Sequence, residues 1–306
     1  MYQVFTIDPG TAESVEQLGT KYKYWFKDPQ GTHQLFKADS RGTGEDWAEK
    51  IACELAELLG VPHVHYELAF ELNSERPGVI CESCATGYTG LALGNQLLLS
   101  RDQAYPAGES NKYYRVRQHT VDAVAQVLNA IARPPDKWTR NMPSGLSSAL
   151  DVFAGYVLLD AWIANQDRHH ENWGALRMGT ALYLAPSFDH GAALARNLLD
   201  AQRQDRLRTR DRTRQIPAYA RRATSAFYRD FPSPKPMNTI EAWQAFAQRT
   251  SAGRRFWPER LRAVTRDVIK EVITKVPENR MTEVCRDFTL ELLLENQRRI
   301  LAGDSQ

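Results

Sequence analysis

The sequence predicts an α+β fold with two lobes, a β-rich lobe over residues 1–85 and a mainly helical lobe over residues 86–306. Two observations support this prediction. Short aromatic or apolar segments separated by turn residues occupy the first part of the chain, which is typical of strands. Longer segments with apolar residues at helical spacing occupy the second part. A chain of 306 residues is long enough for two such lobes, each with its own core.

The β-rich lobe is predicted to contain strands around one helix. Residues 22–27 are rich in aromatic side chains and residues 34–37 are a short apolar segment, so both are predicted strands. The turn sequence Asp28-Pro29-Gln30-Gly31 between them predicts a hairpin. A helix is expected over residues 45–59, because apolar residues recur at helical spacing until Gly60. The extended segments expected after this helix are residues 64–71 and 78–81.

The second lobe is predicted to be mainly helical. Residues 147–164 are almost continuously apolar, which predicts a buried central helix. This helix would end directly before a polar run, residues 165–172, and loops held by a rigid element are where catalytic groups are expected. The other helices expected in this lobe cover residues 121–132, 239–248, 258–274 and 282–301.

Three polar residues carry the strongest functional signal. Asp167 and Asn172 lie in the polar run, and Asp189 follows in the sequence Asp189-His190-Gly191 after a short apolar strand at residues 183–185. An Asp, an Asn five positions later and a second Asp in Asp-x-Gly form the polar set that phosphoryl transfer from Mg·ATP requires. One carboxylate orients and deprotonates the attacking hydroxyl, and the other two groups hold metal ions. Residues 167–172 alone could equally form a solvated loop, but the downstream Asp-x-Gly favours the catalytic interpretation.

Lys37 ends the predicted strand at residues 35–37, where a lysine could contact phosphates if a glutamate of the following helix held its ammonium group. Glu54 and Glu49 are both candidates for that glutamate. Helix geometry slightly prefers Glu54, which lies about 80° from the centre of the apolar face, whereas Glu49 points further away. No G-x-G-x-x-G sequence occurs, and the nearest candidate for a phosphate-covering loop is residues 17–21.

Composition and charge exclude several classes of protein. The net charge of +2 gives no global reason to expect a nucleic-acid or membrane partner. No stretch approaches the about 18 apolar residues that a membrane helix needs, and residues 1–10 do not resemble a signal peptide. Cys81-x-x-Cys84 has no second pair that would make a zinc site, so the four cysteines are predicted to be reduced thiols. We therefore expect a cytoplasmic protein, although signal-less secretion as an effector would leave no trace in the sequence.

Residues 196–230 carry ten arginines against four aspartates. The favoured interpretation is a solvated helical face on which arginines and aspartates pair. The alternative is a docking surface for an acidic or nucleic-acid-bearing substrate, so nucleic acid is an indirect partner at most.

Taken together, these motifs resemble the HipA-like kinase family, the serine/threonine kinases found as toxins of bacterial toxin–antitoxin modules. The resemblance extends over about residues 20–192 and implies a bilobal protein-kinase-like fold. The matching sequences are Asn165-x-Asp167-Arg168-His169-x-x-Asn172, Ala185-Pro186-Ser187-Phe188-Asp189, and Leu35-Phe36-Lys37 with Trp47-Ala48-Glu49.

The resemblance also implies an activity and a role for individual residues. ATP with Mg²⁺ would be the phosphate donor, and a serine or threonine of a protein substrate would be the acceptor. Glu49 is implied as the helix glutamate, against the geometric preference for Glu54, and we follow the family. The other implied roles are Asp167 as catalytic base, Asn172 and Asp189 as Mg²⁺ ligands, Lys37 as phosphate contact, His169 near the phosphates and Glu82 at the hinge.

The chain also departs from the family. It is shorter than the full-length toxins and is expected to lack their separate N-terminal subdomain, so substrate choice does not carry over, and a cognate antitoxin is only a possible partner. Ser14 is the serine nearest to the predicted phosphate loop and is a candidate for autophosphorylation. Two other functions stay open: a small-molecule or lipid kinase with the same catalytic groups, and a non-catalytic module that binds nucleotide or nucleic acid.

Overall fold

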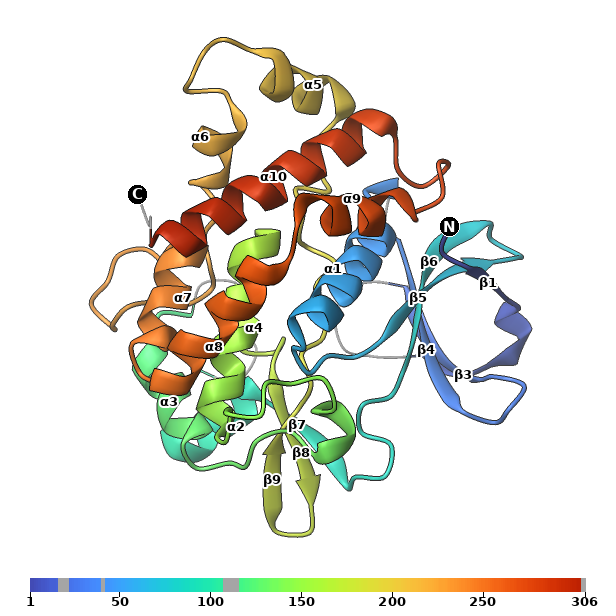
Figure 1. Cartoon of the computed structure of the whole chain (residues 1–306). Helices are drawn as coiled ribbons and strands as arrows, with labels where there is room; N and C mark the ends of the chain where they lie inside the picture. The colour runs from blue at the N-terminus through green and yellow to red at the C-terminus, as the bar shows by residue number, and fades with distance from the viewer. Residues whose placement is uncertain (16–21, 40–41, 107–115, 304–306) are drawn as a thin grey trace.

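The computed structural model describes residues 1–15, 22–39, 42–106 and 116–303. It confirms the predicted α+β fold, with a sheet in the first part of the chain and helices in the second (Figure 1). The predicted phosphate-covering segment at residues 17–21 lies outside the described residues. None of the helices described here combines the length and apolar character that crossing a bilayer requires.

Six strands form the sheet of the first lobe, in the order β1-β5-β6-β4-β3-β2. β1 runs parallel to β5, and all other neighbours are antiparallel. The sequence pattern does not predict β1 and β2, which are short and lie at the two edges of the sheet. The strand bounds are Val4–Ile7 for β1, Ala12–Val15 for β2, Lys23–Lys27 for β3, His33–Ala38 for β4, Tyr66–Glu71 for β5 and Arg76–Glu82 for β6.

The β3–β4 hairpin confirms the predicted turn. One side-chain oxygen of Asp28 accepts the backbone N–H groups of Gln30 at 3.0 Å and Thr32 at 2.8 Å, which fixes the loop. Gly31 has a φ of +82°, a conformation that glycine adopts without a steric penalty. The register places Lys37 opposite Lys23. Lys37 therefore lies near the end of β4 that is away from the turn.

α1 spans Glu45–Leu59, as predicted, and ends where Gly60 adopts a left-handed conformation with a φ of +74°. A side chain at position 60 would come within 2.2 Å of the carbonyl oxygen of Asn141, so the close approach of these two segments also requires glycine. Figure 1 shows α1 between the six-stranded sheet and the helices of the second lobe. Its residues Ile51 and Leu55 are fully buried in the main hydrophobic core, which therefore extends into both lobes.

The second lobe is built around α4, Ala149–Ile163, whose fifteen residues are all buried. This confirms the predicted central helix, and α7, α8 and α10 pack around it. A three-stranded sheet, β7-β8-β9, lies at one end of the lobe. The other helices are α2 (Gly94–Arg101), α3 (Val121–Leu128), α5 (Asp200–Arg208), α6 (Ile216–Ala220), α7 (Thr239–Ala247), α8 (Ser251–Ala263), α9 (Arg266–Thr274) and α10 (Glu283–Ala302); the strands are β7 (Gly90–Leu93), β8 (Gly174–Met178) and β9 (Ala181–Leu184). In the described part of the chain, 3₁₀ turns cover Pro9–Thr11 and Asp136–Trp138.

The single helix predicted over residues 258–274 is wrong. α8 ends at Ala263, Val264 is extended, and α9 begins at Arg266. The hydroxyl of Thr265 accepts the N–H of Val268, so this threonine caps a new helix inside a segment whose apolar spacing is continuous. The predicted boundary between the lobes at residues 85 and 86 falls between the end of β6 and the start of β7 and stays a prediction.

Candidate active site

The loop after α4 is shaped by the end of that helix. Ala164 takes a left-handed conformation with a φ of +54°, which turns the chain out of the helix. The side chain of Asn165 then donates to Asp160 at 2.8 Å and accepts the backbone N–H of Asp167 at 3.1 Å. Asp167 is thereby placed on a loop that is fixed to the buried helix, as the sequence predicts.

Arg168 ties this loop to the segment that carries Asp189. Arg168 is 1% exposed, and its guanidinium group forms two parallel bonds to Asp160, of 2.7 and 2.8 Å. The same group donates to the backbone carbonyls of Asn172 at 2.9 Å and Phe188 at 3.4 Å. Sequence reasoning assigns no role to Asp160, although a carboxylate within an otherwise apolar helix is a signal that it pairs with a buried cation.

Asp167 and Asn172 lie together on this loop. The side-chain amide of Asn172 donates to the backbone carbonyl of Asp167 at 2.7 Å and lies 3.5 Å from its carboxylate. His169 Nε2 lies 3.8 Å from the same carboxylate. Burial lowers the pKa of His169, against an opposing effect of Glu171 and Asp189, so its imidazole is largely neutral near pH 7. Arg168, which contacts the carbonyls of both Asn172 and Phe188, brings this loop next to the segment that leads to Asp189.

Lys37, Glu49 and Asp189 form a second group. Lys37 Nζ lies 2.7 Å from Asp189 Oδ1 and 3.5 Å from Glu49 Oε2. Burial lowers the pKa of Lys37, but the two carboxylates outweigh burial and raise it well above its usual range. Asp189 has a φ of +60°, which Asp tolerates better than most residues, and its N–H is held by the hydroxyl of Tyr66 at 3.3 Å. Strain of this kind is concentrated at functional sites.

The structure resolves the choice between Glu49 and Glu54 as partners of Lys37. Glu49 is 2% exposed and accepts the backbone N–H groups of His190 at 2.6 Å and Gly191 at 3.0 Å. Burial raises the pKa of Glu49, but Lys37 and His190 outweigh burial and lower it.

The geometric preference for Glu54 is wrong, because this residue pairs with Lys50 at 2.7 Å. The apolar face of α1 is a poor guide here: the sheet and residues 189–191 cover the first half of the helix on more than one side. Positions outside the apolar stripe, such as Glu49, are buried as a result.

Two further predicted residues lie outside these groups. Glu82 is the exposed last residue of β6, opposite Gln34 in the β4–β6 register, and its place at the hinge stays a prediction. Ser14 is exposed on β2, opposite Trp25. The structure therefore brings six of the predicted residues together near Arg168 and residues 187–191: Lys37, Glu49, Asp167, His169, Asn172 and Asp189. Glu82 and Ser14 lie on strands outside this group.

The arginine-rich segment, residues 196–230, is partly structural. Arg196 pairs with Glu45 at the start of α1, and Arg203 is buried and bonds to Asp200 at 2.8 Å. Neither of these two pairs lies on a solvated face. The exposed pair of Arg214 with Asp205 is of the kind that the favoured interpretation expects. The arginines of this segment that lie at exposed positions are Arg208, Arg210, Arg212, Arg214, Arg221, Arg222 and Arg229. A docking role for this exposed set stays a prediction.

Comparison with known proteins shows that this architecture is a kinase fold. No protein-family model and no curated protein matches the sequence. The structure is similar to that of the Helicobacter pylori proinflammatory kinase CtkA, with a TM-score of 0.70 and 19% identity, covering 98% of this chain and 97% of that one. It is also similar to HipA of Shewanella oneidensis MR-1, solved with HipB and operator DNA, with a TM-score of 0.55 and 13% identity. The resemblance to HipA-like kinases is thus confirmed at the level of the fold.

The two similarities differ in extent. The alignment with HipA covers 94% of this chain but 65% of the HipA chain, so this protein spans less than two thirds of that toxin. The alignment with CtkA covers nearly all of both chains.

Proposed function

We propose that this protein is a Mg·ATP-dependent kinase that phosphorylates serine or threonine on a protein substrate. The observation that carries the proposal is the Lys37–Glu49–Asp189 group beside the Asp167–Asn172 loop. A lysine held by a helix glutamate, an Asp-x-Gly carboxylate and a loop Asp–Asn pair are the parts that kinases use in phosphoryl transfer. The kinase fold supports the same conclusion.

The residues present fit ATP with Mg²⁺. Mg²⁺ prefers oxygen ligands, and the carboxylate of Asp189 and the side-chain oxygen of Asn172 supply them. Asn172 donates its amide N–H to the carbonyl of Asp167, which leaves Oδ1 as the ligand atom on the other side of the amide. Bound Mg²⁺ would neutralise charge on the phosphates. Lys37 and Asp189 form an ion pair in this structure. When Mg·ATP binds, the phosphates would offer Lys37 a negative charge and the metal ion would offer Asp189 a positive one.

In the proposed reaction Asp167 acts on the acceptor. Its carboxylate orients the substrate hydroxyl and accepts its proton as the oxygen attacks the γ-phosphorus, and the bond from the γ-phosphorus to the bridging oxygen breaks and releases ADP. Lys37 stabilises negative charge on the phosphate oxygens, and Glu49 keeps the lysine in place. Arg168 acts indirectly, because it fixes the loop of Asp167 to the segment of Asp189. Catalysis then depends mainly on positioning and charge stabilisation.

The comparisons also bear on partners. HipA was solved together with HipB and operator DNA, so we include a cognate antitoxin among the proposed partners of this chain. Because the chain spans 65% of the HipA chain, this proposal needs its own test. Co-purification of a stable protein partner from the native cell would support it, and recovery of the chain alone would count against it.

The acceptor is tested by incubating the purified chain with γ-labelled ATP, Mg²⁺ and host lysate, followed by mass spectrometry. We expect label on serine or threonine residues of protein. Label on a soluble metabolite or on lipid would instead assign a small-molecule or lipid kinase with the same catalytic groups. Binding of ATP without transfer to any acceptor would favour a non-catalytic nucleotide-binding module.

A further inference from the structure

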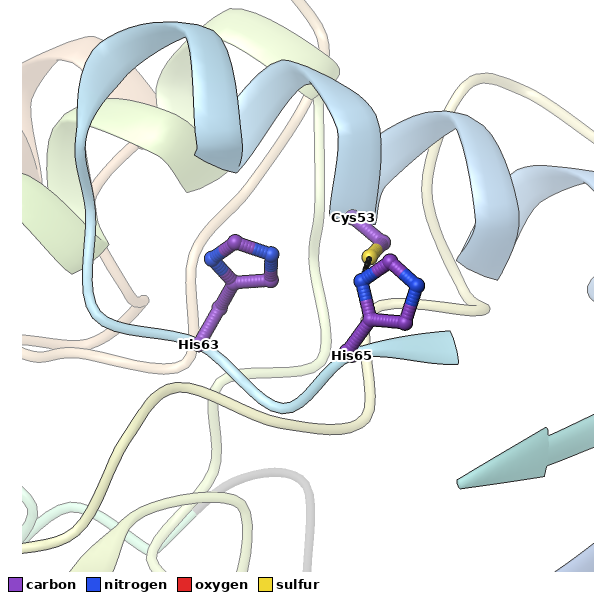
Figure 2. Close-up of side chains that lie close together, drawn as sticks. All are labelled: Cys53, His63 and His65. Atoms are coloured by element: carbon purple, nitrogen blue, oxygen red, sulfur yellow. Dashed lines mark hydrogen bonds between the residues drawn. The ribbon is translucent and has the colours of Figure 1, made fainter. Parts of the chain in front are cut away.

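Cys53, His63 and His65 come together outside the candidate active site (Figure 2). Cys53 lies on α1, and the two histidines lie on the segment that joins α1 to β5. Cys53 Sγ is 3.5 Å from Nδ1 of His65. One potential ligand atom from each of the three side chains lies within 4.8 Å of the other two. A sulfur and two imidazole nitrogens at this separation are a typical donor set for Zn²⁺.

Hydrogen bonds on the outer side of each imidazole determine which nitrogen faces the cysteine. His65 Nε2 lies 2.7 Å from the carboxylate of Glu67, and His63 Nδ1 lies 2.7 Å from the carbonyl oxygen of Val61. Both oxygens only accept, so these outer nitrogens carry protons, which leaves Nδ1 of His65 and Nε2 of His63 as the atoms available to a metal ion. Metal-binding histidines are oriented by outer hydrogen bonds to carboxylates or carbonyls in the same way.

The inner nitrogen of His63 is a second observation that points to a ligand. The residue is 8% exposed, and its Nε2 atom is buried without a hydrogen-bond partner in the described part of the chain. Buried polar atoms are nearly always satisfied, so such an atom needs an explanation. A metal ion between His63, His65 and Cys53 would provide the missing partner.

The cysteine is suited to bind a metal as thiolate. Its side chain is 1% exposed, and the backbone N–H of Tyr66 donates to Sγ at 3.4 Å. The same sulfur lies 3.5 Å from Nδ1 of His65, so it points at the space between the two imidazoles. Burial keeps reagents away from the sulfur, which disfavours a role as an exposed nucleophile.

We propose that Cys53, His63 and His65 bind one Zn²⁺ ion, with water in the fourth position. Zinc takes four ligands tetrahedrally, with Zn–S of about 2.3 Å and Zn–N of about 2.0–2.1 Å, which sets sulfur and nitrogen about 3.6 Å apart. The observed separation of 3.5 Å between Cys53 and His65 already matches this value. The remaining pairs of ligand atoms lie within 4.8 Å of one another and would move closer when the ion binds. A cavity lined by Glu57, Trp138 and both histidines opens beside them and supplies the water.

The proposed ion would stabilise the support of the active site. Val64, between the two histidines, donates its backbone N–H to the carbonyl of Ser187 at 2.9 Å. Tyr66, which follows His65, holds the N–H of Asp189. Zinc would therefore link α1, the helix that carries Glu49, to residues 63–66, the segment that contacts residues 187–189. The zinc proposal does not depend on the proposed kinase activity.

The test measures bound metal in the full chain, purified without chelators and without a polyhistidine tag. After incubation with Zn²⁺ and removal of the excess, we expect one zinc per chain in the wild type by mass spectrometry of the metal. Cys53→Ser and His65→Asn should lose this zinc, whereas Cys84→Ser, which changes a cysteine elsewhere, should keep it. Because the side chain of His65 is 62% exposed, His65→Asn should fold even if Cys53→Ser does not.

A second measurement replaces zinc by cobalt in the wild type. Titration with Co²⁺ should give the visible bands of a tetrahedral site together with a thiolate-to-cobalt charge-transfer band.

Glu67→Gln, which weakens the outer hydrogen bond of His65, should lower zinc affinity by about 10–100-fold. A wild type that binds no zinc, or zinc retained equally in Cys53→Ser and His65→Asn, would overturn the proposal. None of these readouts involves phosphate transfer, so they leave the proposed kinase activity untouched.

Discussion

Replacing Asp160 by Asn is expected to lower the free energy of unfolding by about 3–5 kcal/mol. The substitution keeps the shape of the side chain but removes the carboxylate that faces the guanidinium group of Arg168. Both residues are buried, at 4% and 1% exposed, so the arginine would remain charged without its counter-ion in a poorly solvated environment. Natural domains have about 5–15 kcal/mol of stability, so the loss would be a large fraction of the total. Chemical denaturation of both proteins measures it.

Two controls separate the buried ion pair from a general effect of mutation. Glu291→Gln removes a carboxylate from the exposed pair with Arg266 and should change stability far less, because exposed ion pairs contribute little. The double variant Asp160→Leu/Arg168→Met removes both charges and should recover part of the lost stability, because the carbonyls of Asn172 and Phe188 still lose their donor. A loss below about 1 kcal/mol for Asp160→Asn would show that this pair does not hold the loop as described.

Replacing Asp189 by Asn is expected to lower the rate of phosphate transfer on the order of 10²–10⁴-fold. The carboxylate is the proposed Mg²⁺ ligand of the Asp-x-Gly turn, and an amide carries no charge to hold the cation. Lys37 keeps Glu49 as a partner, so the fold should persist. Steady-state rates over a range of Mg²⁺ concentrations, with an unfolding curve for each protein, measure both effects.

The matched control for this substitution is Asp287→Asn, an equal change at an exposed position of α10. It should leave both the rate and the Mg²⁺ dependence unchanged. If Asp189→Asn transferred phosphate as fast as the control, Asp189 would not be the metal ligand.

Local patterns in the sequence predict much of the fold. The hairpin at Asp28 and the helix α1 follow from turn and cap residues that lie next to the elements they bound. The central helix α4 follows from its continuous apolar character. β1 and β2 escape prediction because they are four residues long and are stabilised by pairing with other strands. The break between α8 and α9 is hidden because Thr265 interrupts a segment whose apolar spacing stays helical.

The candidate site also contains residues that the sequence predicts and residues that only the structure reveals. Asp167, Asn172 and Asp189 form a motif whose spacing is visible in the sequence. Glu49 rather than Glu54 is the partner of Lys37 because other segments of the chain cover its face of α1. Two of the covering residues, His190 and Gly191, are 141 and 142 positions from Glu49 in the sequence, so no local pattern reveals them.

The Cys53 cluster depends in the same way on the path of the chain. The turn at Gly60 brings the segment with both histidines back along α1, next to Cys53. The His63-x-His65 spacing is a signal in the sequence, but its cysteine partner is found only once the turn is known.

The measurement that tests the central claim most directly compares γ-phosphate transfer by the wild type and by Asp167→Asn, with ATP and Mg²⁺. The backbone N–H of residue 167 would still be held by Asn165, so the variant should keep the loop and bind ATP. The account predicts phosphate on protein with the wild type and with the exposed control Asp287→Asn, and little or none with Asp167→Asn. Equal transfer by all three proteins, or binding of Mg·ATP without transfer by any of them, would contradict it.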